Sequence, residues 1–105
     1  MPSKGLTIQL ISISPGVYEV TGDLTFNTVS QLQTLPEQVS SSATTPKIML
    51  DKVQHIDSAG LALLIDWGRQ SMQYHSITFC QPNKQLLRLV DLYNLESVLS
   101  FDHSI

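Results

Sequence analysis

Three side chains able to do acid–base or nucleophilic chemistry, His55, Asp57 and Ser58, lie within four consecutive positions. They are the ingredients of a serine-hydrolase triad, in which an imidazole accepts the hydroxyl proton and a carboxylate orients the imidazole. Such an enzyme also needs an oxyanion hole, and many hydrolases place the serine in Gly-x-Ser-x-Gly. The residues around Ser58 read Ile-Asp-Ser-Ala-Gly instead. We therefore expect no hydrolase activity and no catalytic residue.

Asp57 and Ser58 are also suited to start a helix. The first N–H groups of a helix lack intrahelical partners and carry partial positive charge, so the Asp57 carboxylate would cap them. Ser58 would then present its hydroxyl at an exposed loop–helix edge. A phosphate there would suit the helix and add about two negative charges beside Asp57, which makes Ser58 a candidate phosphorylation site that switches an interface. Helix capping alone is the alternative interpretation.

The remaining sequence does not indicate a metal, nucleotide or nucleic-acid site. His55, His75 and His103 lie far apart without metal-ligand spacing, and Cys80, the single cysteine, is expected to be a small buried side chain. Two glycine-rich patterns that bind phosphate, Gly-x-x-x-x-Gly-Lys-Ser and Gly-x-Gly-x-x-Gly, are absent. The 6 basic residues are dispersed and the net charge is -3, unlike a nucleic-acid-binding surface. We expect no metal and no cofactor, with any ATP bound by a partner.

Length and composition indicate a small folded domain. The 105 residues suffice for a single domain over 1–105. With 42% apolar and only 14% charged residues, disorder is not expected, and the weakly polar surface favours a protein partner. No stretch approaches the roughly 20 apolar residues of a membrane span. We expect a cytoplasmic protein that reaches a membrane only through its complex.

The elements that must position Asp57 and Ser58 begin with a predicted hairpin. Apolar and polar residues alternate approximately over residues 6–14, which is typical of a strand with one solvated face. Pro15-Gly16 indicates a turn, and residues 17–21 resume with β-branched and aromatic side chains. A first strand and a second strand are therefore expected to pair.

A first helix is predicted over residues 26–39, where apolar side chains recur at three-residue spacing from Phe26 onward. Asn27 or Thr28 is suited to cap its start. Pro36 removes a helical hydrogen bond, so we expect the helix to be kinked or broken there.

Strands and helices alternate in the second half of the chain. Residues 47–53 predict a buried strand, a long helix runs from Ser58 to about Tyr74, and residues 77–80 predict another strand. Asn83 caps a further helix, and a short turn or helix follows at residues 95–99. The order β-β-α-β-α-β-α predicts an α/β fold with a mixed sheet of about four strands and helices packed on it. A ferredoxin-like α+β sandwich is the alternative, although it usually ends on a strand.

The long helix has three predicted faces. The face expected in the core carries Leu61, Leu64, Ile65, Gly68 and Met72. The face nearest to Ser58 combines small residues, which permit close approach of a partner, with charged residues that would orient it: Ala59, Ala62, Asp66 and Arg69. Trp67 lies on a third strip and is either an interface anchor or packed against the following helix.

The segment Asp51 to Leu64, DKVQHIDSAGLALL, resembles the signature of the STAS domain family, which includes the anti-sigma-factor antagonists. In that family a strand ends in a short loop, and Asp-Ser or Asp-Thr starts a helix that continues small-Gly-Leu. Gly22-Asp23-Leu24 resembles a second family marker, Gly-Glu-Leu-Asp, with Asp23 in place of Glu and Thr25 in place of the final Asp. Residues 86–95, LLRLVDLYNL, complete a resemblance that covers nearly the whole chain.

The resemblance implies a non-catalytic protein that docks onto a partner through the helix start. The expected partner-binding residues are Asp57, Ser58, Ala59, Gly60, Ala62, Asp66 and Arg69. Within the family, the stretches Gly-Leu-Ala-Leu-Leu and Leu-Tyr-Asn-Leu are most similar to the STAS subunits of bacterial ABC transporters that move phospholipids between the inner and outer membranes. The implied partner is then an ABC-transporter ATPase subunit.

Two other roles remain open from the same resemblance. One is an anti-sigma-factor antagonist that a kinase-type anti-sigma factor switches by phosphorylating Ser58. The other is a STAS module of a stressosome or an anion transporter.

Overall fold

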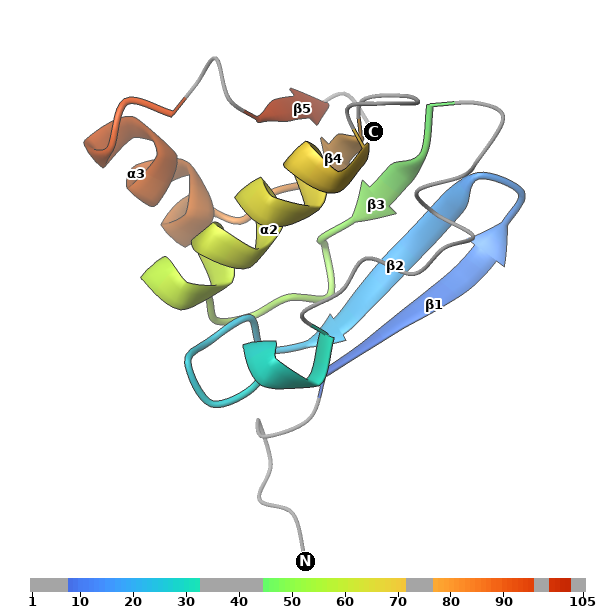
Figure 1. The fold of residues 1–105 in the computed structure, drawn as a ribbon, viewed down its shortest axis with the longest axis horizontal. Coiled ribbons are helices and arrows are strands. Elements are labelled where there is room, and N and C mark those ends of the chain that lie inside the picture. Colours follow the sequence, from blue (N-terminus) through green and yellow to red (C-terminus); the bar gives the residue numbers. More distant parts are fainter. Residues whose placement is uncertain (1–7, 33–44, 72–76, 96–98, 103–105) are drawn as a thin grey trace, which may run out of the picture.

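A five-stranded mixed sheet organises the chain in the computed structural model, which describes residues 8–32, 45–71, 77–95 and 99–102. The elements in chain order are β1 (Ile8–Ser14), β2 (Val17–Gly22), the 3-10 helix η1 (Val29–Leu32), β3 (Lys47–Met49), α2 (Ser58–Ser71), β4 (Thr78–Cys80), α3 (Lys84–Leu92) and β5 (Ser100–Asp102). The strands lie in the order β1-β2-β3-β4-β5, with β1 and β2 antiparallel and the other neighbours parallel (Figure 1). The predicted α/β class with a mixed sheet is confirmed.

The predicted hairpin is present, and its turn explains why glycine follows proline. The pairing runs from Ile8 with Gly22 to Ser14 with Val17. Pro15 and Gly16 are therefore the two residues that join β1 to β2. Gly16 has a φ of 76°, a conformation that a residue with a Cβ adopts only at a steric cost. The turn thus sets the pairing of the first two strands.

The end of the chain differs from the prediction. The sheet has five strands and not about four, because β5 (Ser100–Asp102) pairs with β4 after the position where a final turn or helix was expected. Ser100–Asp102 contains one apolar residue, Phe101, so no apolar run or periodic pattern indicated this strand. Residues 96–98, the middle of that expected turn or helix, lie outside the described residues.

The predicted helices and the third strand are only partly matched. The strand expected at 47–53 is shorter, because β3 ends at Met49 and a turn follows at Asp51–Lys52. Of the first helix expected at 26–39, the described part contains only η1 (Val29–Leu32). Pro36, with the rest of that segment, and the predicted end of the long helix near Tyr74 lie outside the described residues.

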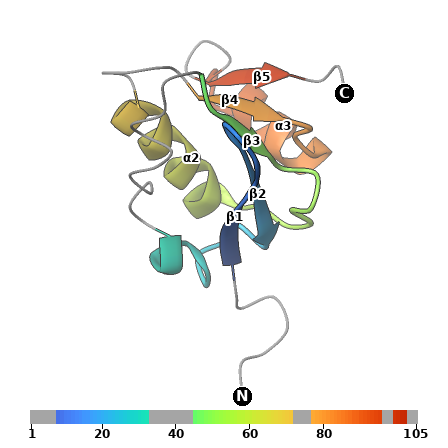
Figure 2. The same ribbon diagram turned by 90° about the vertical axis from the view of Figure 1, so that its right-hand side faces the viewer.

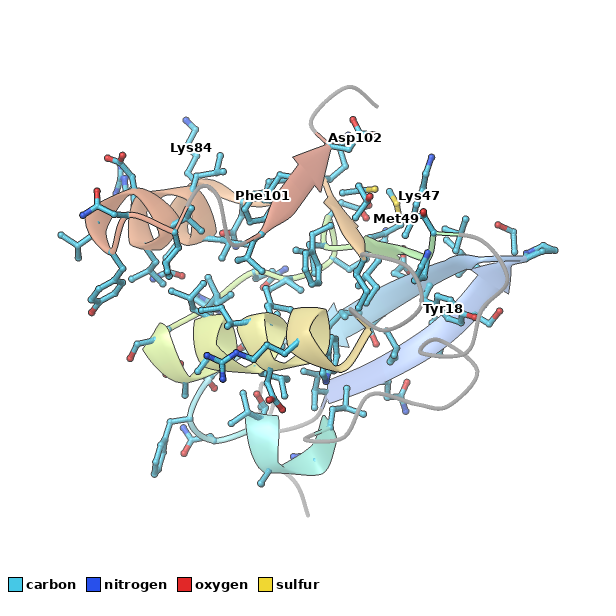
Figure 3. All side chains as sticks on the ribbon, turned by 45° about the horizontal axis from the view of Figure 1, so that its top comes forward. Tyr18, Lys47, Met49, Lys84, Phe101 and Asp102 are labelled. Carbon is cyan, nitrogen blue, oxygen red and sulfur yellow. The ribbon has the colours of Figure 1, made fainter. Side chains whose placement is uncertain are left out.

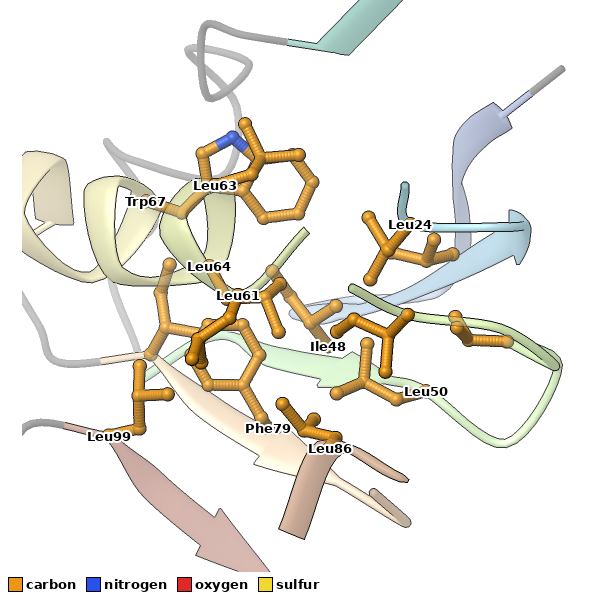
Figure 4. Packing of buried hydrophobic residues seen from close by; sticks show 14 of the residues in the cluster. Leu24, Ile48, Leu50, Leu61, Leu63, Leu64, Trp67, Phe79, Leu86 and Leu99 are labelled. Atoms are coloured by element: carbon orange, nitrogen blue, oxygen red, sulfur yellow. The ribbon is translucent and has the colours of Figure 1, made fainter. Parts of the chain in front are cut away.

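One face of the sheet carries the core. Tyr18, Ile48, Phe79 and Phe101 are aligned across β2, β3, β4 and β5, and the rings of Phe79 and Phe101 lie 6.2 Å apart. Each such side chain that is removed from water contributes about 1.5–3 kcal/mol. The helices cover this face with apolar residues of the same cluster: Leu61, Leu63, Leu64 and Trp67 from α2, and Leu86 and Val90 from α3 (Figure 4). Both α2 and η1 lie on one side of β1 and β2 (Figure 2).

The opposite face of the sheet carries Cys80. Met49, Cys80 and Asp102 are aligned across β3, β4 and β5, and Figure 3 shows Lys47, Met49 and Asp102 directed away from α2. Cys80 is buried as predicted. Burial raises the pKa of its thiol, the Asp102 carboxylate raises it further, and Lys47 opposes the shift.

We predict that Cys80 is protected in the folded chain. The thiolate is the reactive form of cysteine, and both burial and the raised pKa suppress it, so Ellman's reagent should react at least about tenfold more slowly than in urea-unfolded protein. Because the unfolded thiol loses its proton at a lower pH than the folded one, stability should fall as pH rises through the ordinary cysteine range. Cys80→Ala should flatten that alkaline decline in urea titrations. Equal reactivity in the folded and unfolded states would contradict the burial.

Candidate functional site

The start of α2 is joined to a second segment of chain that follows β2. The Leu24 N–H donates to the His55 carbonyl at 2.9 Å, and the Asp57 N–H donates to the Leu24 carbonyl at 3.1 Å. Leu24 also forms an isolated parallel bridge with Ile56. Since Leu24 and Ile56 are buried, these contacts fix the two segments to each other within the core.

The Asp57 carboxylate completes this junction. One oxygen, Oδ1, accepts hydrogen bonds from the N–H groups of Ala59 at 3.0 Å and Gly60 at 3.1 Å, which confirms the predicted helix cap. The other oxygen, Oδ2, accepts from the Phe26 N–H at 3.0 Å. A charged acceptor makes stronger hydrogen bonds than a neutral one, and the helix N-terminus favours its negative charge. One side chain therefore caps α2 and holds the segment at Phe26.

Gly60 is buried and packs against Leu24 of the same chain. A Cβ at Gly60 would come within 2.8 Å of the Leu24 Cβ and closer still to the Leu24 carbonyl oxygen. The missing side chain thus permits the backbones of α2 and residue 24 to approach each other. This corrects one expected partner-binding residue, because Gly60 lies inside the junction and not on a surface that a partner can reach.

Thr28 shapes the turn that carries Phe26. Its side chain is fully buried, and its hydroxyl donates to the Asp23 carbonyl at 2.6 Å and accepts from the Thr25 N–H at 2.9 Å. The Thr28 N–H donates in turn to the Thr25 carbonyl at 2.9 Å. Thr28 was one of two residues expected to cap the first helix. In the structure its hydroxyl closes a turn that precedes η1.

The loop before α2 is held from its other side by α3. The Asn83 carboxamide accepts from the Leu86 N–H at 2.8 Å, which confirms the predicted cap, and it donates to the Val53 carbonyl at 3.2 Å. Gln85 Oε1 accepts from the Ile56 N–H at 2.9 Å. The loop that leads to Ser58 is therefore fixed on both sides before the helix begins.

What this scaffold presents outward is one face of α2. Along it lie four exposed residues, Ser58, Ala62, Asp66 and Arg69, which span about 16 Å along the helix at 1.5 Å per residue. Asp57 and Ala59 are half-buried at its edge. We call Ser58, Ala62, Asp66 and Arg69 the α2 surface. The structure thus brings together the predicted docking residues, with Gly60 removed.

The backbone of Phe26 lies next to the start of this surface, because its N–H donates to the Asp57 carboxylate. Its side chain is 79% exposed, although the three-residue spacing made it the first apolar residue of a predicted helix. The helix that the structure describes begins only at Val29. Phe26 precedes it, so the periodicity of a helix does not determine whether Phe26 is buried. A signal was available in the sequence, because the expected helix cap at Asn27 or Thr28 already places Phe26 outside the helix.

Trp67 is not part of the surface. It is 0% exposed and belongs to the main core cluster together with Leu63 (Figure 4). Its interpretation as an interface anchor was therefore wrong. A helix that buries Leu61, Leu63, Leu64 and Trp67 has a wide apolar face, which the narrow stripe assigned from the sequence underestimated.

The residues that suggested a hydrolase make other contacts. The Asp57 carboxylate faces backbone N–H groups, and His55 Nδ1 lies 3.4 Å from Asp23 Oδ1. Among the described residues, no group of three or more His, Cys, Asp or Glu side chains is placed to hold a metal ion. His75 and His103 lie outside those residues. In the same part of the chain, no helix is long and apolar enough to cross a membrane.

Comparison with known proteins identifies the family of this chain. A family model described as "Mlab, STAS domain" matches residues 11–100. The chain is also similar to the intermembrane phospholipid transport system binding protein MlaB of Haemophilus influenzae, with 45% identity over 47 residues. That alignment covers 44% of this chain and 45% of the relative, so it spans less than half of either.

We predict that Gly60→Ala destabilises the fold and that Gly68→Ala does not. At Gly60 the new methyl would overlap the Leu24 backbone, and such overpacking costs about 1–3 kcal/mol or more. At Gly68, in the same helix, a new Cβ would meet nothing within 4 Å, so alanine should add up to about 1 kcal/mol through helix propensity. Urea denaturation of both variants measures the difference. Equal stabilities would mean that α2 does not approach Leu24 this closely.

Proposed function

The chain belongs to the STAS domain family, and from that premise we propose that it is a non-catalytic adaptor of a phospholipid-transporting ABC complex. In this role it binds the ATPase subunit through the α2 surface at Ser58 and regulates or stabilises that subunit. The observation that carries the proposal is the exposed helix start, held by Asp57 and Leu24 on one side and by α3 on the other. A rigid surface loses little conformational freedom on binding.

The composition of the α2 surface suits a protein partner. Ser58 and Ala62 are small and exposed, so a partner can approach the first turns of the helix closely. Asp66 and Arg69 lie at its far end, where charged groups of both signs would fix the orientation of the complex more than its affinity. The name of the relative, a binding protein of an intermembrane phospholipid transport system, supports this kind of assembly.

The same proposal assigns the chemistry to the partner. The sequence contains neither glycine-rich phosphate-binding pattern, so ATP would bind and react on the ATPase. The adaptor then acts as one STAS domain over residues 1–105, in the cytoplasm, and reaches the inner membrane only through the complex. It needs no cofactor and no metal for this role.

We predict that Ser58→Arg and Ser58→Asp weaken binding to the purified ATPase subunit of the same organism by at least about 30-fold, the loss typical of a central interface position. The reason is that a bulky or charged side chain would separate the partner from the first turn of α2. Isothermal titration calorimetry measures the affinity, and thermal denaturation should show a folded domain, because Ser58 is exposed.

Ser12→Arg is the matched control, since Ser12 is an exposed serine on β1, and it should leave the affinity unchanged. If the Ser58 variants bind the ATPase as tightly as the wild type, the α2 surface is not the docking site. If the wild type does not bind at all, the ATPase is not the partner.

The exposure of Ser58 beside a capped helix start also favours a second candidate, an anti-sigma-factor antagonist switched by phosphorylation. In that case a cognate kinase-type anti-sigma factor and ATP should add one phosphate to the wild type and none to Ser58→Ala, as measured by intact mass. An unmodified wild-type chain after this incubation would rule the switch out.

A further inference from the structure

We propose that Phe26 is the apolar anchor of the docking surface and inserts into an uncharged pocket of the same ATPase partner. This inference rests on the proposed function and adds a residue and a chemistry to its interface. It extends the contact from one helix face to two segments of chain that meet at Asp57.

The exposure of Phe26 sets it apart from the other apolar side chains. At 79% it is the most exposed of the large hydrophobic residues that the structure describes, ahead of Leu92 at 69% and Tyr93 at 52%. An exposed hydrophobic side chain alone is common and has no special meaning. What distinguishes Phe26 is how firmly its backbone is held.

Both sides of Phe26 are fixed by contacts already present in the free chain. Leu24, two residues before it, is fully buried and hydrogen-bonded to the α2 junction. Thr28, two residues after it, is also fully buried and closes the turn. The Phe26 N–H itself donates to Asp57 Oδ2. An aromatic side chain on such a fixed backbone has only two torsions left to order, so its burial in a partner would cost little entropy.

Phe26 is also continuous with the α2 surface. The same Asp57 carboxylate binds the Phe26 N–H and the first N–H groups of the helix that begins at Ser58. A stable interface buries about 800 Å² on each partner and involves roughly 20–30 residues. The exposed residues of one helix face are too few for that, so a partner covering Ser58 must extend beyond α2. The turn at Phe26 is the neighbouring segment attached to the helix start.

The charge pattern of this surface defines the pocket. From Leu24 to Leu32 the sequence LTFNTVSQL has no charged residue, and the Asp57 carboxylate that contacts this segment already accepts three backbone N–H groups. The other end of the α2 surface, by contrast, carries Asp66 and Arg69. The partner is therefore uncharged and apolar opposite Phe26 and carries its charges opposite Asp66 and Arg69. An aromatic ring contributes a large apolar area and frequently supplies the energetic centre of an interface.

The test uses the full chain and the purified ATPase subunit of the same organism in isothermal titration calorimetry. Phe26→Ala should raise the Kd by about 10- to 100-fold, and Phe26→Leu by less, because leucine keeps part of the apolar area. Both variants keep the backbone N–H that binds Asp57, so the junction and the melting temperature should not change. Leu92→Ala is the matched control, as Leu92 is an exposed apolar residue at the end of α3, and its Kd should stay within about twofold of the wild type.

The outcomes separate this inference from the function on which it rests. If the wild type binds, Ser58→Arg does not, and Phe26→Ala binds as tightly as the wild type, then the adaptor role stands and the anchor is wrong. Equal losses for Phe26→Ala and Leu92→Ala would also overturn the anchor, because they would reflect a general surface effect. If the wild type does not bind the ATPase, both proposals fail.

Discussion

One carboxylate, that of Asp57, connects the start of α2 to the segment that carries Phe26. It accepts three backbone hydrogen bonds, two from the first turn of α2 and one from Phe26. The free N–H groups of a helix start are costly to leave unpaired, and a charged acceptor at that position gains from the helix dipole. The interaction that makes α2 begin at Ser58 is therefore also the one that holds a distant segment beside it.

The sheet makes this meeting possible. Strands β2 and β3 are parallel neighbours, so the segments that leave their carboxyl ends emerge at the same edge. The segment after β2 contains Leu24 to Thr28, and the segment after β3 leads to Asp57. Neighbouring carboxyl ends of parallel strands are where α/β folds commonly build their sites. The absence of a side chain at Gly60 then permits the close contact with Leu24, which fixes the distance between the two segments.

Whether a feature could be predicted from the sequence depends on how far apart along the chain the interacting residues lie. The caps by Asp57 and Asn83 were predicted correctly, because a cap depends on residues two or three positions away. Phe26 and Gly60 were misplaced, and Trp67 was left open between an interface and a buried position, because their environments are set by contacts with segments far along the chain. Gly60 could be interpreted as a small residue near a surface until Leu24 was known to lie against it. Strand β5 was missed because Ser100–Asp102 contains one apolar residue, Phe101, whereas the apolar run that ends at Cys80 indicated the equally short β4.

The junction divides the motif DSAG into residues with different tasks. Asp57 and Gly60 act within the chain's own structure, one as a hydrogen-bond acceptor and the other as the site of a close backbone contact. Ser58 is exposed. The motif is thus in large part a folding signature, since two of its four residues act within the domain. A substitution at Asp57 or Gly60 that abolishes binding would report first on the junction, whereas a substitution at the exposed side chains of Ser58 or Phe26 leaves the junction contacts in place and so tests the proposed interface.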